Sequence, residues 1–397
     1  MELKPLRYRR RRSGWGRALI LILAILVGLR LSGLDERAFR ILYTRYLGAY
    51  TLDLVRSLGL DTSVLPEPLQ PTPTPTRNAV SWLAEAETAY WEGDLAAAAR
   101  AYAQAYALEP DNIDALIWQA KLEALRGHTE RAVELARKAV EQEPENALAL
   151  AVLGMALDWH GQPDEGIKYA LKAADLAPDS AEVRAYLAEV YADQGNWGRA
   201  LEEARSAVAL DDRSVVALRN LAYVLEVQGR YEEAIEAYQK ASEVHPKLSY
   251  IYIGAGRNYM ALQRYEDAIA QFQKAIEATP TNADGYDALG WVYFLQGDPE
   301  RAILELEKAI EVDPEYAPAY AHLGVVYYTR RYYEKAIENL LKAIELGIEN
   351  EEYFYELGLA YAFLGQCDQA IPWLERALEL NPNSGPAWDG LRMCSQE

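Results

Sequence analysis

From residue 79 onward, the pattern of small, apolar and polar positions repeats every 34 residues. Nine units align when they are numbered from residues 79, 113, 147, 181, 215, 249, 283, 317 and 351. The eighth position is always alanine or glycine. The twentieth is alanine in eight repeats, with Gly166 as the exception, and the twenty-seventh is alanine from Ala105 to Ala377. Small residues let two helix axes approach closely, so the pattern predicts packed helices.

Within each unit, glycine and proline at helix ends divide the pattern into two helices. Glycine near the middle, as in Gln228-Gly229-Arg230, ends a first helix, and proline near the end starts the turn to the next unit. Leucine at the seventh position and tyrosine at the eleventh supply the bulk that interlocks around the small residues. The sequence therefore predicts a helix–turn–helix unit repeated nine times.

These residues resemble the tetratricopeptide repeat. Repeat six matches best, whereas repeats two and three match least, with Glu123 and Gly166 off the pattern. The nine repeats cover 306 of 397 residues. The best match consists of Tyr252, Gly256, Tyr259, Ala268, Phe272, Ala275 and Pro280.

The resemblance implies an all-α, right-handed superhelical solenoid of helix–turn–helix repeats whose first helices line a concave groove. We expect the nine repeats to occupy residues 79–384 and a solvating cap helix to occupy residues 385–397. The family implies a non-catalytic scaffold that binds a partner protein or peptide in this groove. The alternative is a structural envelope component that acts by self-assembly into a homo-oligomer.

The N-terminus has the pattern of a membrane anchor. Residues 1–17 are basic and precede an apolar segment at 18–34, where Arg30 interrupts the run after 12 residues. A spanning helix needs roughly 20 residues, so a cleaved signal peptide and a buried soluble helix are alternatives. We favour an uncleaved signal-anchor, because arginines cluster before the apolar segment and no cleavage site of small residues follows it. This predicts a single-pass cell-membrane protein with a cytoplasmic N-terminus and extracytoplasmic repeats.

Two further segments separate the anchor from the repeats. Residues 35–60 have an apolar and aromatic stripe at helical spacing, which predicts an amphipathic juxtamembrane helix. That helix could lie on the bilayer or pack on the repeats or on another copy. Residues 61–78 are rich in proline and threonine, which alternate over residues 71–76, and this favours an extended, semi-rigid linker.

Charge narrows the classes of partner. Residues 1–77 hold 13 Lys/Arg and 6 Asp/Glu, which leaves 27 basic and 54 acidic side chains in the remaining residues. A domain this acidic repels phosphate backbones, so we expect no nucleic-acid partner. The sequence has no phosphate loop, nucleophile motif or metal-ligand spacing, and its four histidines are scattered, so we expect no enzyme activity, cofactor or metal.

Candidate binding residues lie at the first-helix positions that face the ligand in this family. Tyr223, Arg257 and Trp291 share the ninth position of repeats five, six and seven, which predicts a guanidinium between two aromatic rings. Such a row could be a binding hot spot or a purely stabilising stack. The full predicted ligand surface is Arg219, Tyr223, Arg257, Asp287, Trp291, Trp91 and Trp159.

The two cysteines lie close to each other in the predicted array. Cys367 falls in the turn of repeat nine and Cys394 near the end of the cap helix. An oxidising compartment would permit a disulfide that ties down the cap, and two free thiols are the alternative.

Overall fold

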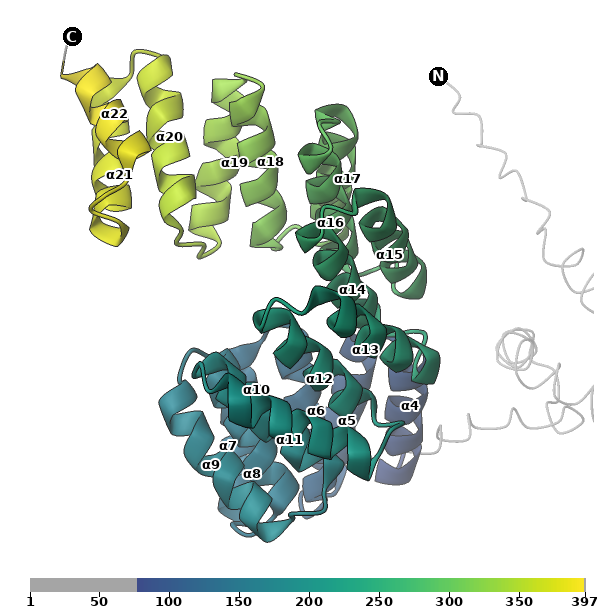
Figure 1. Cartoon of the computed structure of the whole chain (residues 1–397). Helices are drawn as coiled ribbons and strands as arrows, with labels where there is room; N and C mark the ends of the chain where they lie inside the picture. The colour runs from purple at the N-terminus through teal and green to yellow at the C-terminus, as the bar shows by residue number, and fades with distance from the viewer. Residues whose placement is uncertain (1–76, 396–397) are drawn as a thin grey trace, which may run out of the picture. The chain divides into compact units, whose positions relative to one another are not determined.

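The computed structural model describes residues 77–395 as an all-α array with one helix pair per sequence repeat (Figure 1). This part of the chain holds 19 helices, which are nine pairs and a terminal helix, α22 (Gly385–Cys394). The first helices of the pairs are α4 (Ala79–Trp91), α6 (Ile113–Leu125), α8 (Ala147–Trp159), α10 (Ala181–Asp193), α12 (Val215–Val227), α14 (Ser249–Ala261), α16 (Ala283–Leu295), α18 (Ala317–Thr329) and α20 (Glu351–Phe363). The second helices are α5 (Leu95–Leu108), α7 (Thr129–Gln142), α9 (Pro163–Leu176), α11 (Trp197–Leu210), α13 (Tyr231–Val244), α15 (Tyr265–Ala278), α17 (Pro299–Val312), α19 (Tyr333–Glu345) and α21 (Cys367–Leu380).

The turn between the two helices of a repeat has the same backbone conformation in all nine repeats. Its residue, at the fifteenth position, has a positive φ and is glycine in seven of them. Gln263 (φ 58°) and Arg331 (φ 61°) adopt the same conformation in repeats six and eight. Glycine takes this conformation without steric cost, so the mid-repeat glycine ends the first helix as predicted.

Within a repeat, the small eighth position lies under the side chain at the twenty-fourth. In repeat six, a Cβ added to Gly256 would lie 2.3 Å from Cε1 of Phe272, whose ring is fully buried. Gly290 and Gly324 lie in the same way under Leu306 and Leu340. In repeats six to nine, the absence of a side chain at position eight is therefore what admits the large residue from the second helix.

Repeats two to four replace that large residue with alanine, at Ala136, Ala170 and Ala204. In repeat three the helices come closer still, because a Cβ on Gly166 would lie 2.6 Å from the carbonyl oxygen of Gly154. The glycine that departs from the repeat pattern therefore permits direct contact between the backbones of α8 and α9.

The first helices form a continuous layer whose packing changes along the chain. The helix α10 packs extensively against both α8 and α12. From α12 onward, in contrast, each first helix touches the next, through α14, α16, α18 and α20, at few positions. The composition gives the reason: α8 carries four alanines and a glycine ahead of its terminal Trp159, whereas α16 carries Tyr286, Trp291, Tyr293 and Phe294. Aromatic side chains hold neighbouring helices apart, and small ones let them draw together.

The terminal helix α22 covers the end of the array. Its Ala387 is fully buried, and it packs against α20 and α21. The sulfurs of Cys367 and Cys394 are bonded, with the two Cα atoms 5.3 Å apart. The bridge joins the first residue of α21 to the last residue of α22 and thereby holds the cap to the ninth repeat.

The segments predicted at 1–17, 18–34 and 35–60, and all but the last two residues of the linker at 61–78, lie outside the described residues. The compact repeat unit begins at Asn78. Within residues 77–395, no helix is both long enough and apolar enough to cross a membrane.

The contact between Gly256 and Phe272 generates a stability prediction. The variant Gly256→Ala should lower the free energy of unfolding by about 1–3 kcal/mol, because the new methyl group collides with a ring that has no room to move. Gly198 in α11 has open space around it, so Gly198→Ala should raise stability by up to about 1 kcal/mol through helix propensity. Urea denaturation of both variants measures the difference. Equal stabilities would refute the close packing.

Candidate functional site

The first repeat contacts the turn between repeats five and six. Trp91 stacks on His245, with ring centroids 4.4 Å apart and planes 5° from parallel, and Tyr90 meets the same imidazole edge-on at 5.0 Å. A Cβ on Gly93 would lie 2.1 Å from the carbonyl oxygen of Lys247. We call the contact of Tyr90, Trp91 and Gly93 with His245 and Lys247 the clasp. It closes repeats one to five, residues 79–248, into what we call the N-terminal ring.

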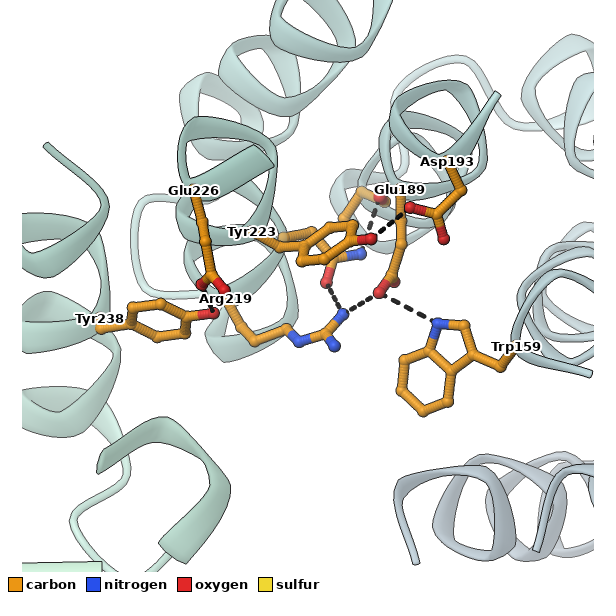
Figure 2. Close-up of polar contacts among 9 residues, drawn as sticks. Trp159, Glu189, Asp193, Arg219, Tyr223, Glu226 and Tyr238 are labelled. Atoms are coloured by element: carbon orange, nitrogen blue, oxygen red, sulfur yellow. Dashed lines mark hydrogen bonds and ion pairs between the residues drawn. The ribbon is translucent and has the colours of Figure 1, made fainter. Parts of the chain in front are cut away.

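The first helices project charged and aromatic side chains into this ring. Arg219 forms an ion pair with Glu189, and Nε1 of Trp159 donates to the same carboxylate at 3.0 Å, as Figure 2 shows. The Arg219 guanidinium lies 5.0 Å from the Trp159 ring and 5.5 Å from the Tyr223 ring. Burial acts to lower the pKa of Arg219, and the charge of Glu189 raises it overall, whereas burial raises the pKa of Glu189 against the opposing charge of Arg219.

A second ion pair in the ring is built in the same way. Lys121 pairs with Glu182, and its ammonium lies 3.8 Å from the centroid of the Trp118 ring. In both pairs the acid, which is buried at Glu189 and partly exposed at Glu182, therefore meets a cation that also lies over an aromatic face.

The side chains of the ring leave little space between them. The cavity bounded by Trp118, Lys121, Trp159, Arg219 and Tyr250 has a volume of about 30 Å³, which is room for about two water molecules. No peptide fits inside it. The space between these residues is therefore largely filled by the protein's own side chains.

Asp158 marks the acidic edge of this interior, near Asp193 and Glu189. It is buried, and burial, reinforced by the charge of Asp193, raises its pKa to about 9. Tyr223 donates its hydroxyl to Asp193 (Figure 2). Asp158 is consequently held neutral at physiological pH, which limits the negative charge that the ring has to accommodate.

Repeats seven to nine carry a second set of charged and aromatic side chains on their first helices. The carboxylate of Asp287 lies 2.7 Å from Nδ1 of His322, and the His322 ring stacks on Trp291 at 4.3 Å. The charge of Asp287 also acts on Tyr353 of α20, beyond His322 of α18. We call this connected set the acidic–aromatic face; it comprises Asp287, Trp291, His322, Tyr328, Glu352, Tyr353, Tyr355 and Glu356.

The structure divides the predicted ligand residues between these two places. Trp91 belongs to the clasp, Trp159, Arg219 and Tyr223 contact one another in the ring, and Asp287 and Trp291 belong to the acidic–aromatic face. Arg257 is exposed on α14, and no cation–π contact joins it to another described residue. The guanidinium between two aromatic rings is that of Arg219, which lies on α12 one turn before Tyr223, rather than that of Arg257 on α14.

Sequence reasoning missed His322 and Glu356, which share the sixth position of repeats eight and nine. That position was not among those expected to face a ligand. In the other seven repeats the sixth position is alanine, valine, glycine or an uncharged larger side chain. Histidine and glutamate at this position were therefore the signal in the sequence that could have indicated a functional role. Among residues 77–395, no group of three or more His, Cys, Asp or Glu side chains is arranged to hold a metal ion.

Comparison with known proteins shows the family. Family models described as tetratricopeptide repeat or TPR repeat match most of the repeat region, and the chain belongs to the tetratricopeptide-repeat family. Repeat scaffolds of this kind are typical of protein–protein interaction. The matched residues are 83–147, 120–181, 152–215, 186–246, 256–297, 290–329, 317–346 and 351–384.

Solved structures share the fold at low identity. The APC/C hetero-tetramer Cut9-Hcn1 superposes with a TM-score of 0.60 at 20% identity, covering 91% of this chain and 69% of that chain. The human IFIT1 dimer with PPP-AAAA gives a TM-score of 0.51 at 20% identity, covering 89% of each chain. A search of curated proteins finds none that matches. These similarities show the helical-repeat fold and nothing finer.

The clasp generates a pH prediction. His245 is fully buried, neither ring nitrogen has a hydrogen-bond partner among the described residues, and burial lowers its pKa. In the unfolded chain the imidazole titrates near pH 6.5, so the unfolded state binds more protons below that pH and stability falls there. His245→Phe keeps the stack on Trp91 and should remove this loss.

Urea denaturation on either side of about pH 6.5 measures the effect. His160→Gln, which changes an exposed histidine, is the control and should keep the wild-type dependence. If His245→Phe loses as much stability on acidification as the wild type, His245 is not the titrating group.

Proposed function

We propose that this chain is a non-catalytic, membrane-tethered scaffold that binds a partner protein or peptide on the acidic–aromatic face. The main support is the stack of Trp291 on His322, oriented by Asp287, on first helices that their neighbours cover only in part. A large aromatic ring beside directional polar groups is the composition of a protein-binding hot spot.

The location of the proposed site follows from what already occupies the first helices of repeats one to five. In the N-terminal ring, Glu182 and Glu189 already have internal cations, and the cavity is too small for a peptide. The acidic–aromatic face is not closed by a clasp, and its acids outnumber its cations. A partner segment would therefore find unsatisfied charge and aromatic surface in repeats seven to nine rather than in repeats one to five.

Membrane tethering and orientation rest on the sequence. The basic residues 1–17 and the apolar residues 18–34 form the proposed signal-anchor, which would leave the repeats extracytoplasmic. The acidity of the repeats argues against nucleic acid as a partner. No cofactor enters the proposal.

Self-assembly of the repeat domain is the second candidate function. Its support is the exposed apolar surface near the C-terminal end, where Phe363, Trp388 and Met393 are each more than a third exposed. Surface of this kind on a terminal helix can pair with a second copy. A mass measurement on the purified chain over a range of concentrations separates the two candidates, because self-assembly would produce a concentration-dependent oligomer.

The proposed site generates a binding prediction. Trp291→Ala should weaken capture of the native partner by at least about 2 kcal/mol, roughly 30-fold, because it removes the largest ring of the face. Trp197→Ala removes a tryptophan that is 54% exposed on a second helix, and it should leave capture unchanged. Affinity purification from native membranes with quantitative mass spectrometry measures both. Melting curves check folding, and full capture by a folded Trp291→Ala protein would reject the site.

The disulfide generates a prediction about compartment. A Cys367–Cys394 bridge persists in an oxidising compartment, so thiol reagent added to cells at lysis should label neither cysteine unless the protein is first reduced. Reductant should then expose two thiols. Two cysteines labelled without reduction would place the repeats in a reducing compartment and overturn the proposed orientation.

A further inference from the structure

Glu356 is a buried acid without a counter-charge. It lies on α20, is 6% exposed, and its Oε2 atom is buried with no hydrogen-bond partner among the described residues. No lysine, arginine or histidine in residues 77–395 forms an ion pair with it. Burying a carboxylate in this way is costly unless a cation or a proton compensates it.

The groups around Glu356 add no positive charge. The described residues whose charge acts on Glu356, or on which it acts, are Glu352, Tyr353 and Tyr355 on α20 and Tyr328 on α18. Burial, with Glu352 as the second cause, raises the pKa of Glu356 to about 8. The groups that interact electrostatically with this acid are thus phenols and one further acid, and a proton is all that neutralises it.

The same protein shows how it compensates such an acid elsewhere. In the N-terminal ring, Glu182 pairs with Lys121 over the Trp118 ring, and Glu189 pairs with Arg219 over the Trp159 ring. Each of those sites combines an acid, an aromatic ring and a cation, and at Glu189 the acid is buried as Glu356 is. At Glu356 the acid and the aromatic rings are present, and the chain supplies no cation.

We propose that Glu356 receives a lysine or arginine side chain of the bound partner, so that the partner segment is basic. The inference rests on the proposed function and names the chemical class of its ligand. The tyrosine rings around the acid would contact the aliphatic stem of the incoming side chain and attract its charged end. The strongly acidic repeat domain would also accelerate the approach of a basic segment.

Binding of a cation at Glu356 would change the protonation of its carboxyl group. A bound cation favours the ionised carboxylate, so binding should expel the proton that Glu356 carries below about pH 8. Affinity should therefore rise as pH increases toward that value. Burial holds the pKa of Tyr328 and of Tyr353 at about 12, so the phenols of these two residues stay neutral in this range.

Titration calorimetry of the full chain with a hexalysine peptide tests the proposal. Repeating the titration in buffers of different protonation enthalpy counts the protons released. We expect about one proton to be released near neutral pH, and affinity to rise about 50-fold between about pH 6 and about pH 8. Glu356→Gln keeps the shape of the protonated acid, and it should abolish the release and weaken binding about 10- to 100-fold.

The control is Glu338→Gln, which removes the same charge from an exposed position on α19 and should behave as the wild type. The proposal is overturned if Glu356→Gln retains the proton release and the affinity, or if a hexaglutamate peptide binds as well as hexalysine. The first result combined with loss of partner capture in Trp291→Ala would leave the proposed function standing and reject only the basic ligand.

Discussion

Close approach of helix backbones at alanine and glycine is the constraint on which the rest of this structure depends. Gly154 and Gly166 let the backbones of α8 and α9 touch, and the alanines of α8 let the first helices of repeats three to five pack together. Because the first helices form the inner layer, drawing them together tightens the curve of the array. Repeats one to five therefore close on themselves through the stack of Trp91 on His245.

The same layer has the opposite character in repeats seven to nine, where aromatic side chains keep the first helices apart. This difference separates charged side chains that pair within the fold from charged side chains that are available to a partner. In the ring, Glu189 and Arg219 form a buried ion pair that stabilises the fold. Outside it, Glu356 has surroundings of the same kind and no cation of its own. The two parts of one repeat array thus differ at Glu189, which pairs with a cation of the same chain, and Glu356, which pairs with none among the described residues.

Much of this fold could be predicted from the sequence, because the 34-residue period, the mid-repeat glycines and the small positions act locally or between adjacent helices. The closure of the ring could not be predicted. It sums small rotations over five repeats and ends in a contact between Trp91 and His245 that no local pattern encodes. The predicted stack of Arg257 between Tyr223 and Trp291 likewise differs from the structure, in which the guanidinium between two rings is that of Arg219, between Trp159 and Tyr223.

The central claim is that a partner binds the first helices of repeats seven to nine and not the N-terminal ring. Site-specific photo-crosslinking in native membranes tests it most directly, with the reactive amino acid placed singly at Tyr355, Trp91 or Trp197. We expect a crosslinked partner from Tyr355 and none from Trp91 in the clasp or Trp197 on α11. A partner crosslinked from Trp91 and absent from Tyr355 would contradict the account.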